Sequence, residues 1–263
     1  MNIALIGYGK MGKMIEQVAL AAGHSVTVIV DPFVKDTASG VKIDKTIAEA
    51  DFSSVDAAIE FTQPDTAVAN ILALAERKVP TIVGTTAWQG KCANALDEVC
   101  KAVEKSGSCL LWASNFSIGV NMFYRIAWYA AELANNFSEY DAGGFESHHN
   151  KKMDSPSGTA KTLAEGVLSR IERKKKIVWE TIDRKPEADE LHFPSLRLGS
   201  VPGTHSLFFD SPADTIEITH TARSREGFAS GAVQAAKWLT SQKRQGIFTI
   251  DDMMNELFNK WEQ

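Results

Sequence analysis

The chain has 263 residues, of which 44% are hydrophobic and 23% charged, as is ordinary for a globular protein of one or two domains. Its net charge of -5 argues against a nucleic-acid partner, because phosphate binding needs a basic face. No apolar stretch approaches the roughly 20 residues of a membrane span, and the first residues do not read as a signal peptide, so we expect a cytoplasmic protein with no membrane partner.

The first half of the chain alternates short apolar runs with segments of helical periodicity. Strands are expected at 2–6, 25–30, 55–61, 80–83 and 109–113, and helices at 11–22, 65–77 and 87–105. Because continuous apolar strands alternate with helices, the strands should form a parallel sheet with helices on both faces. The pattern predicts an α/β fold with a Rossmann-type doubly wound parallel sheet.

The pattern changes after residue 116. A long helix is expected after Ser117, its N-cap, as far as about Asn135. Its large apolar side chains form a stripe that we assign to the core: Met122, Ile126, Tyr129 and Leu133. Beyond Tyr140 only one helix is expected, after Pro156, and the runs at 196–199, 204–209 and 215–221 predict neighbouring antiparallel strands. These features indicate a second, α+β domain with a mixed or antiparallel sheet.

The last part of the chain returns to helical periodicity. Helices are expected at 227–239 and 250–261, and Thr249 with Asp252 forms a candidate capping box at the start of the second. Because these helices can pack back on the first domain, we assign 1–116 and 222–263 to a discontinuous dinucleotide-binding domain. Residues 117–221 form the second domain.

Neither the cysteines nor the one basic cluster indicates a further site. Cys92, Cys100 and Cys109 have no metal-ligand spacing and are expected to be reduced thiols. The cluster at 173–176 ends a predicted helix, where positive charge suits the negative end of the helix dipole, and we expect it to be solvated.

A glycine-rich loop follows the first strand, with Gly7, Gly9 and Gly12 spaced as GxGxxG around Lys10 and Met11. The motif is weak alone, but here it follows a strand and opens a helix, as in dinucleotide-binding proteins. The glycines permit a tight turn and the close approach of a pyrophosphate, toward which the N–H groups of the helix point.

An acidic residue, Asp31, ends the second strand 19 residues after Gly12. There it can accept hydrogen bonds from the adenosine ribose hydroxyls, which favours NADH. Lys10 and Lys35 can attract a 2′-phosphate, so NADPH stays open as the cofactor. The alternative role of Asp31 is that of a turn residue before Pro32.

Two short polar segments follow later strands. Phe61 and Thr62 begin one, and Gly84, Thr85 and Thr86 form the other. Open α/β sheets bind ligands at the carboxyl ends of their strands, where these side chains can meet a nicotinamide ribose or carboxamide. Ordinary loop chemistry explains them equally well.

The densest polar constellation of the chain is the segment from Glu146 to Thr159. Its His-His-x-x-Lys group combines a side chain that titrates near neutral pH with a fixed positive charge, which suits proton delivery and carboxylate binding. Ser157, Gly158 and Thr159 after Pro156 read as a helix start that can hold an anion, such as a small dicarboxylate. A zinc pair, which lacks further ligands in the sequence, and a polar surface loop are the alternatives.

The same segment resembles the signature of 4-hydroxy-tetrahydrodipicolinate (dihydrodipicolinate) reductases of bacterial lysine and diaminopimelate biosynthesis. The resemblance extends over almost the whole chain, through GYGKMG at 7–12, FTQP at 61–64, VGTT at 83–86, ASNFSIGVN at 113–121 and ITHTARSREGFASGA from Ile218. It implies an NAD(P)H-dependent oxidoreductase that uses no metal and reduces dihydrodipicolinate to tetrahydrodipicolinate.

The resemblance also implies roles for individual residues. His148 corresponds to the family's proton-handling histidine and Lys152 to its proton-donating lysine. The residues implied to contact a substrate carboxylate are His149, Ser157, Gly158 and Thr159, with Arg225 approaching on domain closure. Beside the glycine loop, Gly84–Thr86 and Ala113, Ser114, Asn115 and Phe116 correspond to cofactor loops. A homotetramer joined through the sheets of the second domain is implied as well, which makes that domain one for substrate binding and oligomerisation.

Four positions depart from the family's pattern: Lys10, Asn150, Ser155 and Trp88. Lys10 stands where arginine is common, which leaves the 2′-phosphate preference open. Trp88 replaces another aromatic residue, and we expect it to stack near the nicotinamide.

Two other functions stay open. A different imine or amino-acid dehydrogenase would share the glycine loop without needing the dicarboxylate cradle at 157–159. A non-enzymatic NADH-binding redox sensor would have no use for His148 and Lys152.

Overall fold

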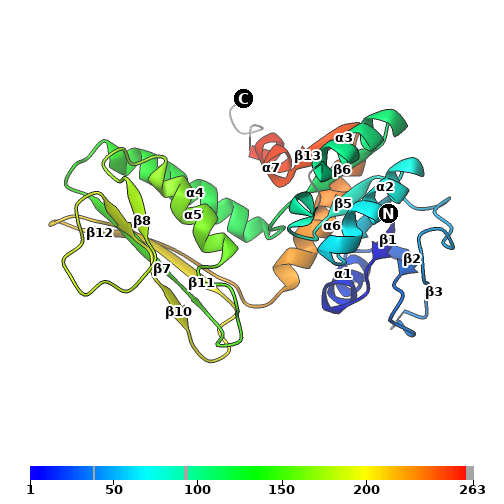
Figure 1. Ribbon diagram of the computed structural model, residues 1–263, viewed down its shortest axis with the longest axis horizontal. Helices are drawn as coiled ribbons and strands as arrows, with labels where there is room; N and C mark the ends of the chain where they lie inside the picture. The colour runs from blue at the N-terminus through cyan, green and yellow to red at the C-terminus, as the bar shows by residue number, and fades with distance from the viewer. Residues whose placement is uncertain (38, 92–93, 259–263) are drawn as a thin grey trace. The chain divides into compact units, whose positions relative to one another are not determined.

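The computed structural model describes residues 1–37, 39–91 and 94–258, so Cys92 and the expected end of the last helix, 259–261, lie outside the described residues. The chain divides into two units (Figure 1). Unit 1 comprises Met1–Ser117 and the chain from Glu226 onward, and unit 2 comprises Ile118–Arg225. The sequence boundaries at 116/117 and 221/222 differ from these by one and four residues.

Unit 1 is built on a parallel sheet of seven strands in the order β13-β6-β5-β4-β1-β2-β3. The strands are β1 (Asn2–Ile6), β2 (Ser25–Val30), β3 (Ile43–Asp44), β4 (Ala57–Glu60), β5 (Thr81–Val83), β6 (Cys109–Trp112) and β13 (Gly246–Thr249). The strand order runs in both directions from β1, so the carboxyl edge between β1 and β4 is a topological switch point, where such sheets bind ligands. The predicted doubly wound parallel sheet is confirmed.

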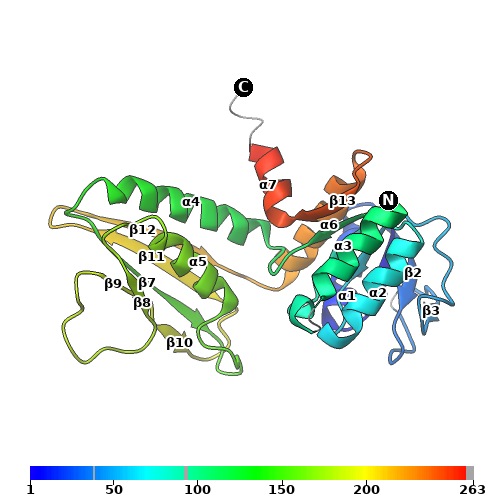
Figure 2. The same ribbon diagram turned by 45° about the horizontal axis from the view of Figure 1, so that its top comes forward.

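Helices cover both faces of this sheet, because right-handed crossovers that run in opposite directions from β1 place their helices on opposite sides. Unit 1 contains α1 (Lys10–Ala21), α2 (Pro64–Glu76), the short η1 (Trp88–Gly90), α3 (Ala95–Ser106), α6 (Glu226–Thr240) and α7 (Ile250–Phe258). α1 packs against α6. α2 packs against α3, and Figure 2 shows these two helices side by side. The capping box is confirmed, since the Thr249 amide donates to Asp252 at 2.7 Å and the Asp252 amide donates to the Thr249 hydroxyl at 3.4 Å.

Unit 2 packs two helices, α4 (Ile118–Asn135) and α5 (Gly158–Leu168), on one face of a mixed sheet. The strands are β7 (Asp141–His148), β8 (Lys176–Val178), β9 (Glu190–His192), β10 (Ser195–Arg197), β11 (Thr204–Asp210) and β12 (Thr215–Thr221). Their order is β12-β11-β7-β9-β8, with β10 also paired to β7. β11 is antiparallel to β12 and β7, whereas β9 and β10 are parallel to β7.

The predicted core face of α4 is wrong. Ile126, Tyr129 and Leu133 are 54%, 63% and 50% exposed, and Met122 is exposed as well. The buried stripe contains Phe123, Ala127 and Ala131 instead. The alanines of this buried stripe let α4 approach α5 and the sheet closely. The stripe of larger side chains, Met122 to Leu133, is therefore the exposed one.

Two further expectations in unit 2 are wrong. The strand expected at 196–199 corresponds to β10. It was expected to be an antiparallel neighbour of the strand at 204–209, but it pairs in parallel with β7. The basic cluster at 173–176 does not end a helix and is not solvated throughout. The Lys174 ammonium is buried, donates to the carbonyl of Glu190 at 2.7 Å and pairs with Asp141 at 2.6 Å. Among the described residues no helix is long and apolar enough to cross a membrane.

Candidate active site

The glycine loop between β1 and α1 is held by two close backbone approaches. Gly7 has a φ of +92°, and a Cβ atom there would overlap the carbonyl oxygen of Phe61. A Cβ atom on Gly12 would overlap the carbonyl oxygen of Gly7, so α1 starts directly against the loop. Gly9 differs, because a Cβ atom there would meet nothing within 4 Å. The loop therefore presents backbone and the N-terminus of α1, beside Lys10 and Met11, at the carboxyl edge of the sheet.

The Asp31 carboxylate fastens this loop to the end of β2. One of its oxygens accepts the Tyr8 amide at 2.7 Å, and the other accepts the amides of Phe33 at 2.8 Å and Val34 at 3.1 Å. A carboxylate has about four acceptor sites, so three are occupied and one is left for a ribose hydroxyl. Asp31 is thus both a turn residue, which was the alternative expectation, and a remaining acceptor beside the loop.

The two other polar segments of unit 1 are joined to each other. The Thr62 amide donates to the Thr85 hydroxyl at 2.8 Å. A Cβ atom on Gly84 would overlap the Phe61 ring, which in turn lies 6.2 Å from the ring of Phe116. Phe61, Thr62 and Gly84–Thr86 therefore form one packed edge beside the segment 113–116, in which the Asn115 side chain accepts the Ser117 amide at 2.9 Å.

Beneath this edge lies an acidic side chain, Glu60, to which the sequence analysis assigned no role. Glu60 is completely buried at the end of β4, and its carboxyl group contacts the Thr62 hydroxyl and the Asn70 amide. Burial raises the pKa of Glu60, against the opposing effect of hydrogen bonds from Thr62, Thr85 and Asn70. The expectation that Trp88 stacks near the nicotinamide is wrong. Its side chain is fully buried in the core near Trp112, so it cannot stack on a nicotinamide.

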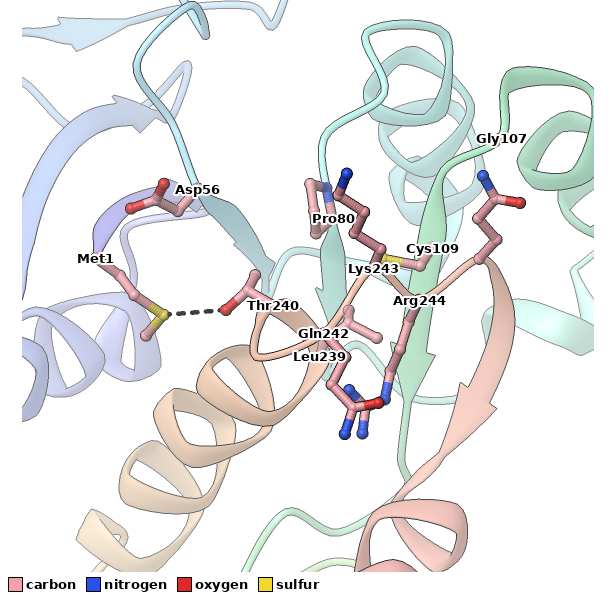
Figure 3. A pocket seen from close by; sticks show the side chains of 11 residues that line it. Met1, Asp56, Pro80, Gly107, Cys109, Leu239, Thr240, Gln242, Lys243 and Arg244 are labelled. Carbon is pink, nitrogen blue, oxygen red and sulfur yellow. Dashed lines mark hydrogen bonds between the residues drawn. The ribbon is translucent and has the colours of Figure 1, made fainter.

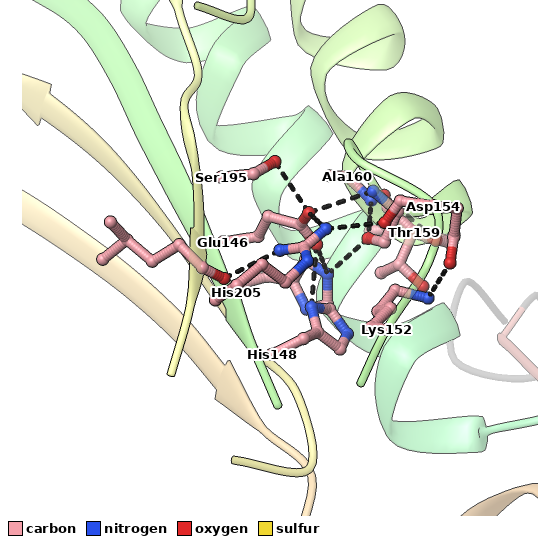
Figure 4. A network of polar contacts seen from close by, with 12 residues as sticks. Glu146, His148, Lys152, Asp154, Thr159, Ala160, Ser195 and His205 are labelled. Carbon is pink, nitrogen blue, oxygen red and sulfur yellow. Dashed lines mark hydrogen bonds and ion pairs between the residues drawn. The ribbon is translucent and has the colours of Figure 1, made fainter. Parts of the chain in front are cut away.

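A second polar group lies in unit 2 around Glu146, which is completely buried on β7 (Figure 4). One oxygen of its carboxylate, Oε1, accepts the Ser157 amide at 3.0 Å, the Ser195 hydroxyl at 2.8 Å and the Arg197 guanidinium at 2.9 Å. Burial alone would raise the pKa of Glu146, but hydrogen bonds from His205, Ser157 and Ser195 hold it well below its usual range. The group is therefore a fixed buried anion.

Two histidines lie against the other oxygen, Oε2. His148 Nδ1 is 2.9 Å from it and His205 Nε2 is 3.4 Å from it, and the two rings meet edge to face with centroids 5.2 Å apart. The pKa of His148 is lowered to about 4, chiefly by burial; the negative charge of Glu146 opposes this shift, and His205, Lys152 and Arg197 add to it. His148 is therefore neutral at pH 7.

Lys152 lies in the turn after β7, where its amide donates to the His149 carbonyl at 3.1 Å. Its ammonium contacts Asp154 at 2.8 Å, and the side chain is 22% exposed. The positive charge of Lys152 helps to lower the pKa of His148, so the two side chains interact electrostatically. The neighbouring His149 is partly buried.

The start of α5 forms the predicted helix N-terminus. Ser157 is its N-cap, and the Ser157 hydroxyl accepts the Ala160 amide at 3.1 Å and contacts His205 at 3.2 Å. This buried hydroxyl serves the fold, whereas Gly158 is exposed in the first turn. Arg225 is exposed at the end of unit 2 and forms no ion pair with a described residue.

Sequence reasoning assigned no role to Glu146, Ser195, Arg197 or His205. Strand pairing brings them together, because Glu146 pairs with Ser195 on β10 and with His205 on β11. The sequence carries no local signal for residues 49 to 59 positions away.

Within the described part of the chain, one group of buried side chains could hold a metal ion: Glu146, His148 and His205. Glu146, His148 and His205 offer atoms within 4.8 Å of one another. The zinc alternative in the sequence was the adjacent pair His148 and His149, whereas this group joins His148 to Glu146 and His205 and leaves out His149. Arg197 already balances the charge of Glu146 at 2.9 Å, which opposes the binding of a divalent cation.

A pocket of unit 1 lies at the other edge of the parallel sheet (Figure 3). Met1, Asp56, Pro80 and Cys109 line it at the amino ends of the strands, together with Arg244. The glycine loop is at the carboxyl ends, so this pocket is separate from the predicted cofactor loops.

Both parts of the chain match models of one family. Residues 1–116 match the model described as dihydrodipicolinate reductase, N-terminus, and residues 119–254 match dihydrodipicolinate reductase, C-terminus. A 4-hydroxy-tetrahydrodipicolinate reductase of Christiangramia forsetii is 39% identical over 98% of this chain and 99% of its own. One of Archaeoglobus fulgidus is 35% identical over 97% of this chain and 100% of its own.

Solved structures share the fold. A dipicolinate-bound dihydrodipicolinate reductase from Paenisporosarcina sp. TG-14 matches with a TM-score of 0.75 at 18% identity, over 95% of this chain and 97% of its own. An amine dehydrogenase from Mycobacterium smegmatis matches with a TM-score of 0.61 at 13% identity, over 95% of each chain.

Proposed function

The chain belongs to the dihydrodipicolinate reductase family, and from that premise we propose how its own residues carry out the reduction. It is an NAD(P)H-dependent oxidoreductase that reduces dihydrodipicolinate, formed from 4-hydroxy-tetrahydrodipicolinate by loss of water, to tetrahydrodipicolinate in diaminopimelate and lysine biosynthesis. The observation that carries this function is that one chain contains both a dinucleotide loop at 7–12 and the polar group at 146–159. Each segment lies within the part of the chain that matches its family model.

The proposed cofactor site is the carboxyl edge of the unit 1 sheet. NADH or NADPH supplies the hydride when bound there. In this proposal the pyrophosphate binds the glycine loop and the start of α1. The nicotinamide half binds the joined segments at 61–62 and 84–86, together with 113–116. The remaining acceptor site of Asp31 favours a free ribose hydroxyl, which makes NADH the preferred cofactor.

The proposed substrate site is the start of α5 with the His-His-x-x-Lys group. A small dicarboxylate fits a helix N-terminus, because its first N–H groups have no carbonyl partner within the helix. Gly158, Thr159 and His149 are the proposed carboxylate contacts, and Arg225 is a further candidate. Ser157 contributes by fixing the start of the helix, since its hydroxyl already caps α5.

Proton delivery is assigned to Lys152, with His148 beside it. Hydride addition to the conjugated C=N–C=C system leaves negative charge that a proton must neutralise. The lowered pKa of His148 keeps that ring neutral, so Lys152 rather than His148 is the proposed donor, and His148 is its neighbour in the site. No metal takes part in this proposal.

A cytoplasmic homotetramer joined through the sheets of unit 2 completes the proposal. The sheet face that points away from α4 and α5 carries Phe145 and Phe208, whose rings stack 6.0 Å apart, and Leu196, which is 51% exposed. Exposed apolar faces of this kind mark association surfaces. Leu196→Glu should yield smaller particles in light scattering, whereas Leu20→Glu, equally exposed on α1 of unit 1, should not.

The test of the activity is NADH oxidation with enzymatically generated substrate. We expect turnover that requires dihydrodipicolinate, with deuterium from C4-labelled NADH recovered in tetrahydrodipicolinate, and a loss of most turnover in His148→Gln. Turnover of a different imino acid alone would favour another imine or amino-acid dehydrogenase. NADH binding without any turnover would favour a redox sensor.

A further inference from the structure

We propose that Glu146 is a positioning residue that selects the tautomer of His148, holding the proton on Nδ1 so that Nε2 is the nitrogen that exchanges protons in the reaction. This inference rests on the proposed function, because it assumes that His148 takes part in proton transfer. In this proposal Glu146 itself contacts neither substrate nor cofactor.

The first observation is a pair of buried atoms that lack other partners. Within the described part of the chain, neither Glu146 Oε2 nor His148 Nδ1 has an aligned hydrogen-bond partner, yet they lie 2.9 Å apart. Leaving a buried polar atom unpaired costs about 1–3 kcal/mol. At 2.9 Å the two atoms are within hydrogen-bond distance, and pairing them avoids this cost.

The second observation is that the carboxylate cannot turn away. Oε1 is fixed by three donors from three places in the chain: the Ser157 amide, the Ser195 hydroxyl and the Arg197 guanidinium. Oε2 is thereby directed at the two histidine rings. A carboxylate that stays ionised only accepts hydrogen bonds, so the ring nitrogen that faces it must carry the proton.

The third observation concerns the opposite side of the His148 ring. A Cβ atom on Gly203 would lie 2.8 Å from His148 Nε2, so only a glycine there leaves room beside that nitrogen. The His148 side chain is 11% exposed. The ring thus has one edge held by Glu146 and the other edge lined by a residue without a side chain.

The charged and titratable groups around His148 are Glu146, His205, Lys152 and Arg197. Glu146 is the one acidic group among them, and it favours the protonated ring against burial and the three others. Replacing it with glutamine should therefore lower the pKa of His148 further. An amide also donates as well as accepts, so glutamine no longer dictates which ring nitrogen carries the proton.

The experiment compares wild type, Glu146→Gln, Glu146→Asp and Glu190→Gln. Glu190 is the matched control, since it is a buried carboxylate of the same sheet that pairs with Arg184 at 2.7 Å. It lies on β9, which pairs with β7 at Gly143, five residues before His148. We expect kcat to fall roughly tenfold to hundredfold in Glu146→Gln with little change in KM, and to recover in part in Glu146→Asp. Glu190→Gln should lose stability but keep kcat.

An activity-independent measurement accompanies the kinetics: exchange of the histidine C2 proton, followed by mass spectrometry across pH, reports the titration of His148. Its midpoint should move to lower pH in Glu146→Gln and stay in place in Glu190→Gln. Unchanged kcat and an unchanged midpoint in folded Glu146→Gln would overturn the inference while leaving the proposed function intact. Full turnover in His148→Gln would instead refute the proposed role of that histidine. Tight zinc binding that wild type loses on Glu146→Gln would replace the inference with a metal site.

Discussion

The backbone amide of Thr62 donates a hydrogen bond to the side-chain hydroxyl of Thr85, 2.8 Å away, and so joins two loops that follow different strands of the parallel sheet. Both loops lie above the buried Glu60, which contacts the Thr62 hydroxyl. The edge proposed for the nicotinamide half of the cofactor is therefore a single connected unit rather than two independent loops.

Breaking this connection should weaken cofactor binding. Thr85→Val keeps the shape of the side chain and removes the acceptor, so we expect the KM for NADH to rise about tenfold with a smaller change in stability. Thr81→Val is the control, because it removes a buried hydroxyl from the amino end of the same strand, where it donates to the Val79 carbonyl at 2.9 Å. Equal KM values in the two variants would count against the proposed edge.

The glycine loop offers a pair of variants that separate binding from folding. Gly9 has ordinary backbone angles and open space for a Cβ atom, so Gly9→Ala should fold normally and lose NADH affinity in a fluorescence titration. In Gly12→Ala the methyl group would overlap the Gly7 carbonyl, and we expect a loss of roughly 1–3 kcal/mol in the free energy of unfolding. Unaltered NADH affinity in Gly9→Ala would show that the pyrophosphate does not bind this loop.

The proposed preference for NADH over NADPH rests on the Asp31 acceptor site that no backbone amide of the described residues occupies. Because a 2′-phosphate would meet a carboxylate, wild type should have a lower KM for NADH than for NADPH. Asp31→Asn removes the charge and keeps an acceptor for the loop amides, so the ratio of the two KM values should move toward one. A strong preference of wild type for NADPH would contradict this role.

Acid stability should report the neutral state of His148. Its folded pKa is about 4, below the 6.5 of an unfolded histidine, so as pH falls the unfolded chain takes up the proton first. Above about pH 6.5 the titration of His148 does not change the free energy of unfolding. As pH falls from 6.5 toward 4, it lowers that free energy. Between pH 7.5 and 5, urea unfolding of wild type should lose about 1–2 kcal/mol more than His148→Gln. Parallel losses in both proteins would mean that His148 titrates normally.

The fold was predictable where one stretch of sequence carries its own signal. Apolar runs between helices predicted the parallel sheet, and the spacing of Gly7, Gly9 and Gly12 located the loop. β3 and β8 have two and three residues, and neither stood out as an apolar run between helices, so they were not predicted. On α4 two apolar stripes compete, and only packing decides that Ala127 and Ala131 face inward.

For the candidate site, the sequence indicated one contiguous segment but not the residues that surround it in the fold. The segment from Glu146 to Thr159 is contiguous, so its histidines, lysine and helix start stood out together. The environment of His148 depends on Ser195, Arg197 and His205, which reach it only through the pairing of β7 with β10 and β11. Long-range strand pairing leaves no periodic signal in one sequence, and the buried anion at Glu146 was missed for that reason.

The most direct test of the central claim compares two adjacent lysines in the reduction of dihydrodipicolinate. Lys151 is exposed, whereas Lys152 lies beside His148 and Asp154. If Lys152 donates the proton, Lys152→Ala should lower kcat by about 100-fold or more, and Lys151→Ala should keep kcat within about twofold of wild type. Equal kcat values in the two variants would contradict the account.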